Sequence, residues 1–254
     1  GMNFAKITVL QLDDKDRLKM YESGQLSGLA LIAPFLSLET YRKYLSGIPQ
    51  YQTTGIPVLD REDKSTGSAN FNSLAYIDIS RGYLSDAFYV VLRRPGAYLG
   101  GVLRAAVLYF QPASSQAFFK SNRRAAAAAD RFCNLVLYGQ PAAICGSREV
   151  PGFKERIELR RSVPGMGLFL AAAFLLSVCC GFRRVLNLRG SGTADPAAAL
   201  TVAFLLFNIL YVTLVGNLLE LGENSRFRFM VDPCILVILA LFLRRFTAWA
   251  EKPA

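Results

Sequence analysis

Residues 196–219 read PAAALTVAFLLFNILYVTLVGNLL, a run of 24 residues without a charged side chain. At a rise of about 1.5 Å per residue, a helix of this length can cross a hydrocarbon core about 30 Å thick. Residues 165–182, GMGLFLAAAFLLSVCCGF, form a second uncharged run, which ends at a pair of arginines. We therefore predict a mainly α-helical protein with membrane-spanning helices at 165–182 and 196–219.

A third apolar run is shorter than these two. Residues 233–243, PCILVILALFL, are followed at once by two arginines. This run can cross a bilayer only if the helix extends from about Phe227 into Trp249, with Arg and Trp side chains reaching the interface. We predict a third spanning helix at about 229–246. The alternatives are a buried helix of a soluble protein and a re-entrant segment.

Charged residues divide the chain into two regions. Residues 1–164 carry 21 Lys and Arg and 14 Asp and Glu, whereas residues 165–254 carry 8 and 5. The chain as a whole is 52% hydrophobic with a mean hydropathy of +0.29, which is too apolar for an ordinary soluble protein. We therefore predict a polar region at 1–164 followed by a membrane region at 165–254.

The net charge of +10 raises the question of a nucleic-acid partner. Much of this charge borders the apolar runs, where basic residues contact anionic lipid headgroups. No RNP, zinc-finger or helix-turn-helix signature accompanies it. We therefore expect membrane lipids, and no nucleic acid, as partners.

The absence of histidine limits the chemistry that this chain can perform. It excludes Ser/His/Asp and Cys/His catalysis within the chain and the usual zinc sites that contain histidine. The five cysteines show no metal-binding spacing, so we expect no metal site. Cys133 and Cys145 could form a disulfide if their region faces an oxidising compartment.

Residues 81–110, RGYLSDAFYVVLRRPGAYLGGVLRAAVLYF, predict an amphipathic helix. Apolar side chains group on one face, and Arg93 and Arg104 lie on the other. Pro95 can either open a second helix or kink a single one. The segment near 83–110 could lie on the membrane surface, with both arginines contacting lipid phosphates, or pack on the core of the polar region.

The orientation in the membrane does not follow from charge counts alone. Lys and Arg in the short connections are equally numerous on the two sides of the membrane. The paired arginines at 183–184 and 244–245 lie on one of these sides and favour it as the cytoplasmic side. This places residues 1–164 outside the cytoplasm. The opening GMNFAKITVLQLDD lacks the features of a signal peptide. We therefore expect either the inverse orientation or a longer protein whose upstream helices deliver this region.

Residues 222–242, GENSRFRFMVDPCILVILALF, resemble the last external loop and final helix of a known enzyme family. This family is the GT-C class of bacterial polyprenyl-phosphate-dependent glycosyltransferases, which includes protein-mannosyltransferase-like and aminoarabinose-transferase-like proteins. Residues 70–114 look like an external segment of the same family, in which one helix lies on the membrane. The resemblance implies that this chain is the carboxyl-terminal region of such an enzyme.

The resemblance also implies a function and a location. We expect an integral protein of the bacterial inner membrane that transfers a sugar from a polyprenyl-phosphate donor at the extracytoplasmic face. In the family, the catalytic carboxylates and any divalent metal lie in the first external loop, after a first spanning helix. The resemblance therefore places the catalytic residues, and a divalent metal if one is used, upstream of this chain, with no catalytic residue inside it.

In this interpretation the loop at 222–229 binds the donor. Arg226 and Arg228 would hold the lipid phosphate through charge-assisted hydrogen bonds, and the adjacent phenylalanines would pack against the isoprenoid. Glu223, three residues before Arg226, would orient its guanidinium. The alternative is a hairpin whose arginines extend to ordinary lipid headgroups.

Two other functions stay open. The chain could be a non-enzymatic membrane-anchored scaffold or a subunit of an envelope complex, because it lacks its own catalytic base. It could also be a small transporter module, because Asn208, Asn217 and Glu220 are polar residues on or next to the second apolar run.

Overall fold

The computed structural model shows a mainly helical protein that forms two compact units. No β-strand occurs among the residues that it describes, although Asp63 and Ala69 form an isolated β-bridge. The described residues are 1–45, 53–110, 128–129, 131–137, 139, 165–190, 196–222 and 224–250. The prediction of a mainly α protein is confirmed.

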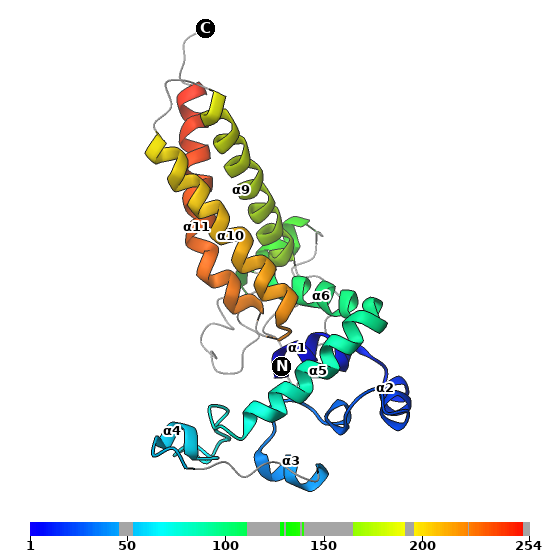
Figure 1. Cartoon of the computed structure of the whole chain (residues 1–254). Helices are drawn as coiled ribbons and strands as arrows, with labels where there is room; N and C mark the ends of the chain where they lie inside the picture. Colours follow the sequence, from blue (N-terminus) through cyan, green and yellow to red (C-terminus); the bar gives the residue numbers. More distant parts are fainter. Residues whose placement is uncertain are drawn as a thin grey trace. The chain divides into compact units, whose positions relative to one another are not determined.

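Unit 1 contains residues Gly1–Leu103 together with the short segment Leu218–Leu221. Most of its helices are short, and α5 is the longest of those shown in Figure 1. Its elements are α1 (Met2–Ile7), η1 (Val9–Gln11), α2 (Asp14–Glu22), η2 (Gly28–Leu31), α3 (Leu38–Tyr44), α4 (Pro57–Asp60), α5 (Tyr76–Arg93) and the first part of α6 (Pro95–Tyr109).

Helix α5 supplies one side of the core of unit 1. Its buried residues recur every three or four positions, which is the spacing of one helical face. They pack with buried residues of α1, η1 and α3, including Tyr41. The helix ends because Arg94 precedes a proline and leaves the helical conformation, with φ −136° and ψ 56°. Pro95 therefore opens a second helix, which was one of the two outcomes that the sequence left open.

Polar groups on α5 fasten the irregular segment 27–36. The Tyr83 hydroxyl donates to the carbonyl of Ile32 at 2.9 Å. The Asp86 carboxylate accepts from the Ser27 amide at 3.0 Å and from its hydroxyl at 2.6 Å. Burial raises the pKa of both Tyr83 and Asp86 above their ordinary values. Because buried polar groups are costly when unpaired, these bonds determine how the segment lies on α5.

Unit 2 contains residues Arg104–Asn217 and Gly222–Ala254. Its three long helices, α9 (Gly165–Gly190), α10 (Pro196–Leu219, whose last two residues belong to unit 1) and α11 (Asn224–Ala250), run side by side in Figure 1. The apolar cluster between them includes Ile209, Val231 and Ile238. Gly181 on α9 allows a close approach, since a Cβ there would lie 3.3 Å from Leu206 and 3.6 Å from Ile238.

Two of the described helices are long and apolar enough to cross a membrane. They are Gly167–Leu186 in α9 and Ala197–Leu219 in α10. Only 17% of each apolar stretch is buried, whereas a core helix of a soluble protein is mostly buried. The predicted apolar helices at 165–182 and 196–219 are therefore confirmed, and together they favour a membrane location.

The third predicted span at 229–246 lies within α11. The helix extends over Asn224–Ala250 and so covers the length that a span from about Phe227 to Trp249 requires. Among the described helices, however, α11 is not one of the two that are apolar enough to span by themselves. The reason is charge at both ends of its apolar part, where Arg226, Arg228 and Asp232 lie near the start and Arg244 lies near the end.

Candidate functional site

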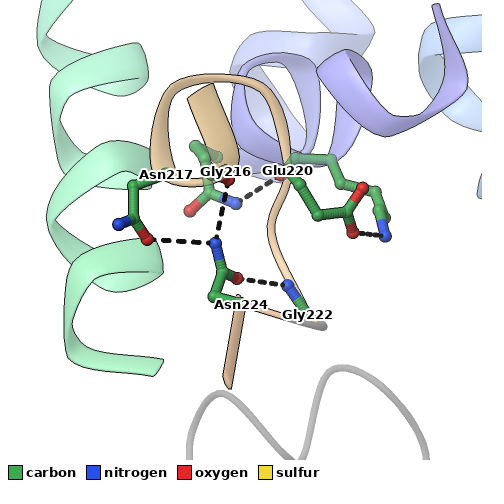
Figure 2. Close-up of polar contacts among 7 residues, drawn as sticks. Gly216, Asn217, Glu220, Gly222 and Asn224 are labelled. Atoms are coloured by element: carbon green, nitrogen blue, oxygen red, sulfur yellow. Dashed lines mark hydrogen bonds and ion pairs between the residues drawn. The ribbon is translucent and has the colours of Figure 1, made fainter. Parts of the chain in front are cut away.

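A group of polar residues fixes the start of α11 in unit 2. The side chain of Asn224 is fully buried and donates to the carbonyl of Gly216 and to the Asn217 side chain, both at 3.2 Å (Figure 2). Its Oδ1 accepts from the Gly222 amide at 3.0 Å. Gly222 adopts a φ of 134°, a backbone conformation that would be strained in a residue with a side chain. These contacts fix the turn between α10 and α11, so that α11 begins at Asn224.

Phe227 fixes the next turn of α11. Its ring lies against Gly216 of α10, where a Cβ would come within 3.1 Å of the ring. A larger residue at position 216 would therefore push the two helices apart. Together with Asn224, this contact determines which side of α11 faces its neighbours.

Arg228 lies on that inner side and is buried. Its Nη1 donates to the carbonyl of Tyr109 at 2.9 Å, and its Nε lies 3.3 Å from Oδ1 of Asp232. Tyr109 is the last residue of α6, so its carbonyl is one of those that a helix end leaves without an intrahelical partner. The Tyr109 hydroxyl contacts the Thr213 hydroxyl at 2.7 Å. Arg228 therefore joins the end of α6 to α11.

Arg226 lies on the opposite, exposed side of α11. Residues two positions apart in a helix differ by about 200° in direction around the helix axis. Arg226 and Arg228 therefore point away from each other. Arg226 instead shares a face with Phe229 and Met230, three and four residues later, which are 73% and 68% exposed. Leu236, further along this side, is also exposed. Arg226 thus stands at one end of an exposed apolar stripe.

This arrangement corrects one sequence-based expectation. The segment 222–229 was predicted to be a loop in which Arg226 and Arg228 act together. The loop is shorter, because the buried contacts of Asn224 start the helix there. Helical geometry then separates the two arginines. Glu223, the predicted partner of Arg226, lies outside the described residues.

The other predicted lipid contacts lie on α5 and α6. Arg93 is the last residue of α5 and Arg104 lies within α6, and both are exposed. No cluster of three His, Cys, Asp or Glu side chains that could hold a metal ion occurs among the described residues. The predicted pairing of Cys133 with Cys145 involves a residue outside that part of the chain.

The polar residues behind the transporter hypothesis have structural partners. The Asn208 side chain donates to the Phe204 carbonyl at 2.8 Å, and that of Asn217 donates to the Thr213 carbonyl at 2.8 Å. Glu220 is buried and forms an ion pair with Lys6 within unit 1. These groups hold helices and turns in place.

Sequence reasoning missed Asn224 and Tyr109. Asn followed by Ser before an apolar run is a common start of a helix, so GENS contained a signal for Asn224. Tyr109 had no such signal, since it lies 119 residues from the arginine that binds its carbonyl.

Comparisons with family models, with curated proteins and with solved structures gave no match to this chain.

Proposed function

We propose that this chain is the carboxyl-terminal region of an integral-membrane glycosyltransferase that uses a polyprenyl-phosphate sugar donor. The observation that carries the proposal is the exposed face of α11, where Arg226 adjoins Phe229 and Met230. A polyprenyl phosphate has an anionic head and a long hydrocarbon tail. A cation at the end of an apolar stripe is complementary to both parts.

The proposal requires α11 to cross the membrane as a third span, at about 229–246. The stripe then faces lipid, and Arg226 lies at the interface, where the donor phosphate is. Residues 1–164 lie on the same, extracytoplasmic side of the bacterial inner membrane. The guanidinium supplies planar donors that match two phosphate oxygens at once. The catalytic carboxylates, and any divalent metal, belong to a part of the enzyme upstream of these residues.

The two arginines take different roles in this proposal. Arg226 binds the phosphate, and Arg228 is a positioning residue, because its donors contact the Tyr109 carbonyl and Asp232. Removing Arg228 would loosen the start of α11 and displace Arg226. Removing Arg226, which is exposed, should disturb the fold less than removing the buried Arg228.

Sugar transfer by the full-length protein in its native membranes tests the proposal. We expect Arg226→Gln to lower transfer at limiting donor by about tenfold or more, because a charge-assisted hydrogen bond contributes about 1.5–3 kcal/mol. Arg226→Lys should keep part of the activity, since it keeps the charge without the planar donors. Arg244→Gln is the matched control, because it removes one exposed positive charge at the other end of α11.

If the Arg226→Gln variant transferred sugar as fast as the wild type, this face of α11 would have no role in binding the donor. If, in addition, a second protein co-purified in mild detergent and no lipid-linked sugar changed its binding, a non-enzymatic scaffold would explain the chain better. Equal losses in Arg226→Gln and Arg244→Gln would indicate a general effect of charge at the membrane surface.

A further inference from the structure

Helix α10 carries a row of five side chains on its outer side, which we call the α10 seam. Its members are separated by three, four, three and four residues, a spacing that keeps them on one side of a helix. Four of them are exposed, and the central one, Asn208, is partly exposed. The seam consists of Thr201, Phe204, Asn208, Tyr211 and Val215.

The spacing of the seam is that of the contact positions of a coiled coil. Thr201, Asn208 and Val215 recur every seven residues, and Phe204 and Tyr211 occupy the second contact position of each repeat. In parallel two-stranded coiled coils, β-branched residues are favoured at the first position, and a single Asn there fixes the register of the two helices. The α10 seam therefore has the pattern of a parallel pair of helices.

Asn208 lies at the centre of the apolar stretch Ala197–Leu219. One N–H of its side chain donates to the Phe204 carbonyl at 2.8 Å. The other N–H and the carboxamide oxygen have no hydrogen-bond partner in the part of the chain that the structure describes. Hydrocarbon offers no hydrogen bonds, so an unpaired carboxamide is costly there. The seam thus presents one donor and one acceptor at the middle of a candidate span.

Tyr211 adds a second polar group three residues further along the seam. Its ring stacks on that of Phe207, with the ring centroids 5.6 Å apart and 18° between the ring planes. Among the described residues, its hydroxyl has no hydrogen-bond partner. The Thr201 hydroxyl, in contrast, donates to the Ala197 carbonyl of its own helix. The unpaired polar groups of the seam therefore lie within one turn of each other, around Asn208.

We propose that the α10 seam binds a second copy of this chain, as a parallel pair of α10 helices. Identical chains enter a membrane in the same orientation, so the two Asn208 side chains lie at the same depth. Each carboxamide then donates its remaining N–H to the oxygen of the other, which satisfies both. A second copy is the favoured occupant because it supplies this matching donor and acceptor itself. The pairing does not depend on sugar transfer.

Energy transfer between copies of the full chain tests this proposal. Donor and acceptor fluorescent proteins are fused after Ala254, and the two proteins are reconstituted together in vesicles of uncharged lipid at several protein-to-lipid ratios. We expect transfer above the level of random proximity. It should rise with the protein-to-lipid ratio to a plateau and depend linearly on the acceptor fraction, as it does for pairs.

Substitutions at position 208 separate the carboxamide from its surroundings. Asn208→Leu should raise the dissociation constant of the pair by about three- to thirtyfold. Asn208→Gln keeps a carboxamide that can pair with its copy, so most of the association should remain. Leu214→Ala is the matched control, because Leu214 is an exposed residue of the same helix outside the seam, and it should bind as wild type.

Three results would overturn the proposal. One is transfer no greater than random proximity in the wild type, and another is an unchanged dissociation constant in Asn208→Leu. A curved dependence on the acceptor fraction would show an assembly larger than a pair.

If no transfer occurred, a tryptophan in the seam would identify the other occupant. Tyr211→Trp is made in a Trp249→Phe background, because Trp249 is the one native tryptophan. Quenching of its emission by lipids brominated in the middle of the acyl chains would show that lipid covers the seam. Unquenched emission would show that another part of the same chain covers it.

Discussion

Unit 1 and unit 2 use buried polar groups in different ways. In unit 1 they are spread over several segments, at Thr8, Arg17, Asn70, Ser73, Asp86 and Glu220. On α5, Tyr83 and Asp86 fasten the segment 27–36 to the helix. In unit 2 those of α10 and α11 gather around the start of α11, where Asn224 and Arg228 join helices whose outer surfaces are apolar. The difference indicates that unit 1 depends on many scattered polar contacts, whereas unit 2 depends on apolar packing and on one polar junction that sets its register.

The largest effect should come from emptying the core of unit 1. Tyr83→Ala removes a fully buried ring and its bond to Ile32, so we expect a loss of about 3–5 kcal/mol in the free energy of unfolding. Tyr44→Ala, at an exposed position, should change it little. Hydrogen exchange should show the loss of protection in α5 and not in α10. Equal loss in α10 would contradict an effect confined to unit 1.

The ion pair between Lys6 and Glu220 should give the next largest effect, because Glu220 is buried in unit 1 and the Lys6 side chain is only 12% exposed. Lys6→Met leaves a buried carboxylate without this partner, so we expect a loss of about 3 kcal/mol. The double variant Lys6→Met with Glu220→Met should recover most of this loss, as measured by a double-mutant cycle in urea unfolding. Additive losses would show that the pair does not hold residues 218–221 on unit 1.

The polar junction of unit 2 should be less sensitive, because Asp232 is partly exposed and can be solvated. Arg228→Met leaves the Tyr109 carbonyl without this donor, so we expect a loss of about 1–3 kcal/mol in the unfolding free energy. Arg226→Met, on the exposed side of the same helix, should change it by less than about 0.5 kcal/mol. Unfolding in detergent compares the two, and equal losses would contradict their separate roles.

The smallest effect concerns pH and belongs to unit 1. Burial raises the pKa of Asp86 above its ordinary value of 3.8, so the folded state favours the protonated form. The stability of unit 1 therefore falls as pH rises from 3.8 through the raised pKa. Asp86→Asn keeps the shape without this titration. We expect its stability relative to wild type to increase with pH over that window, and a constant difference would contradict the effect.

Much of the fold could be predicted from the sequence. Long uncharged runs predicted α10 and most of α9, because a hydrocarbon-length helix leaves a clear compositional pattern. Helix α2 begins at Asp14, after Asp13 in an extended conformation. The burial of Arg17 in that helix was not predictable, since its bond to the Ala30 carbonyl depends on tertiary packing.

The site was less predictable than the fold. Arg226 and Arg228 were recognised as unusual because charges stood between apolar runs. Their opposite directions followed only once the helix start was known, and the start depends on buried contacts of Asn224 with α10. Contacts over such distances in the chain leave no local pattern, so sequence alone could not separate a binding arginine from a positioning one.

Direct binding of a polyprenyl phosphate tests the central claim, that the exposed face around Arg226 holds the lipid phosphate. The full chain, placed in nanodiscs of uncharged lipid, would be titrated with the phosphorylated lipid for wild type, Arg226→Gln and Arg244→Gln. We predict that Arg226→Gln weakens binding by about tenfold or more while Arg244→Gln binds as wild type. Equal affinity in all three proteins would contradict the claim.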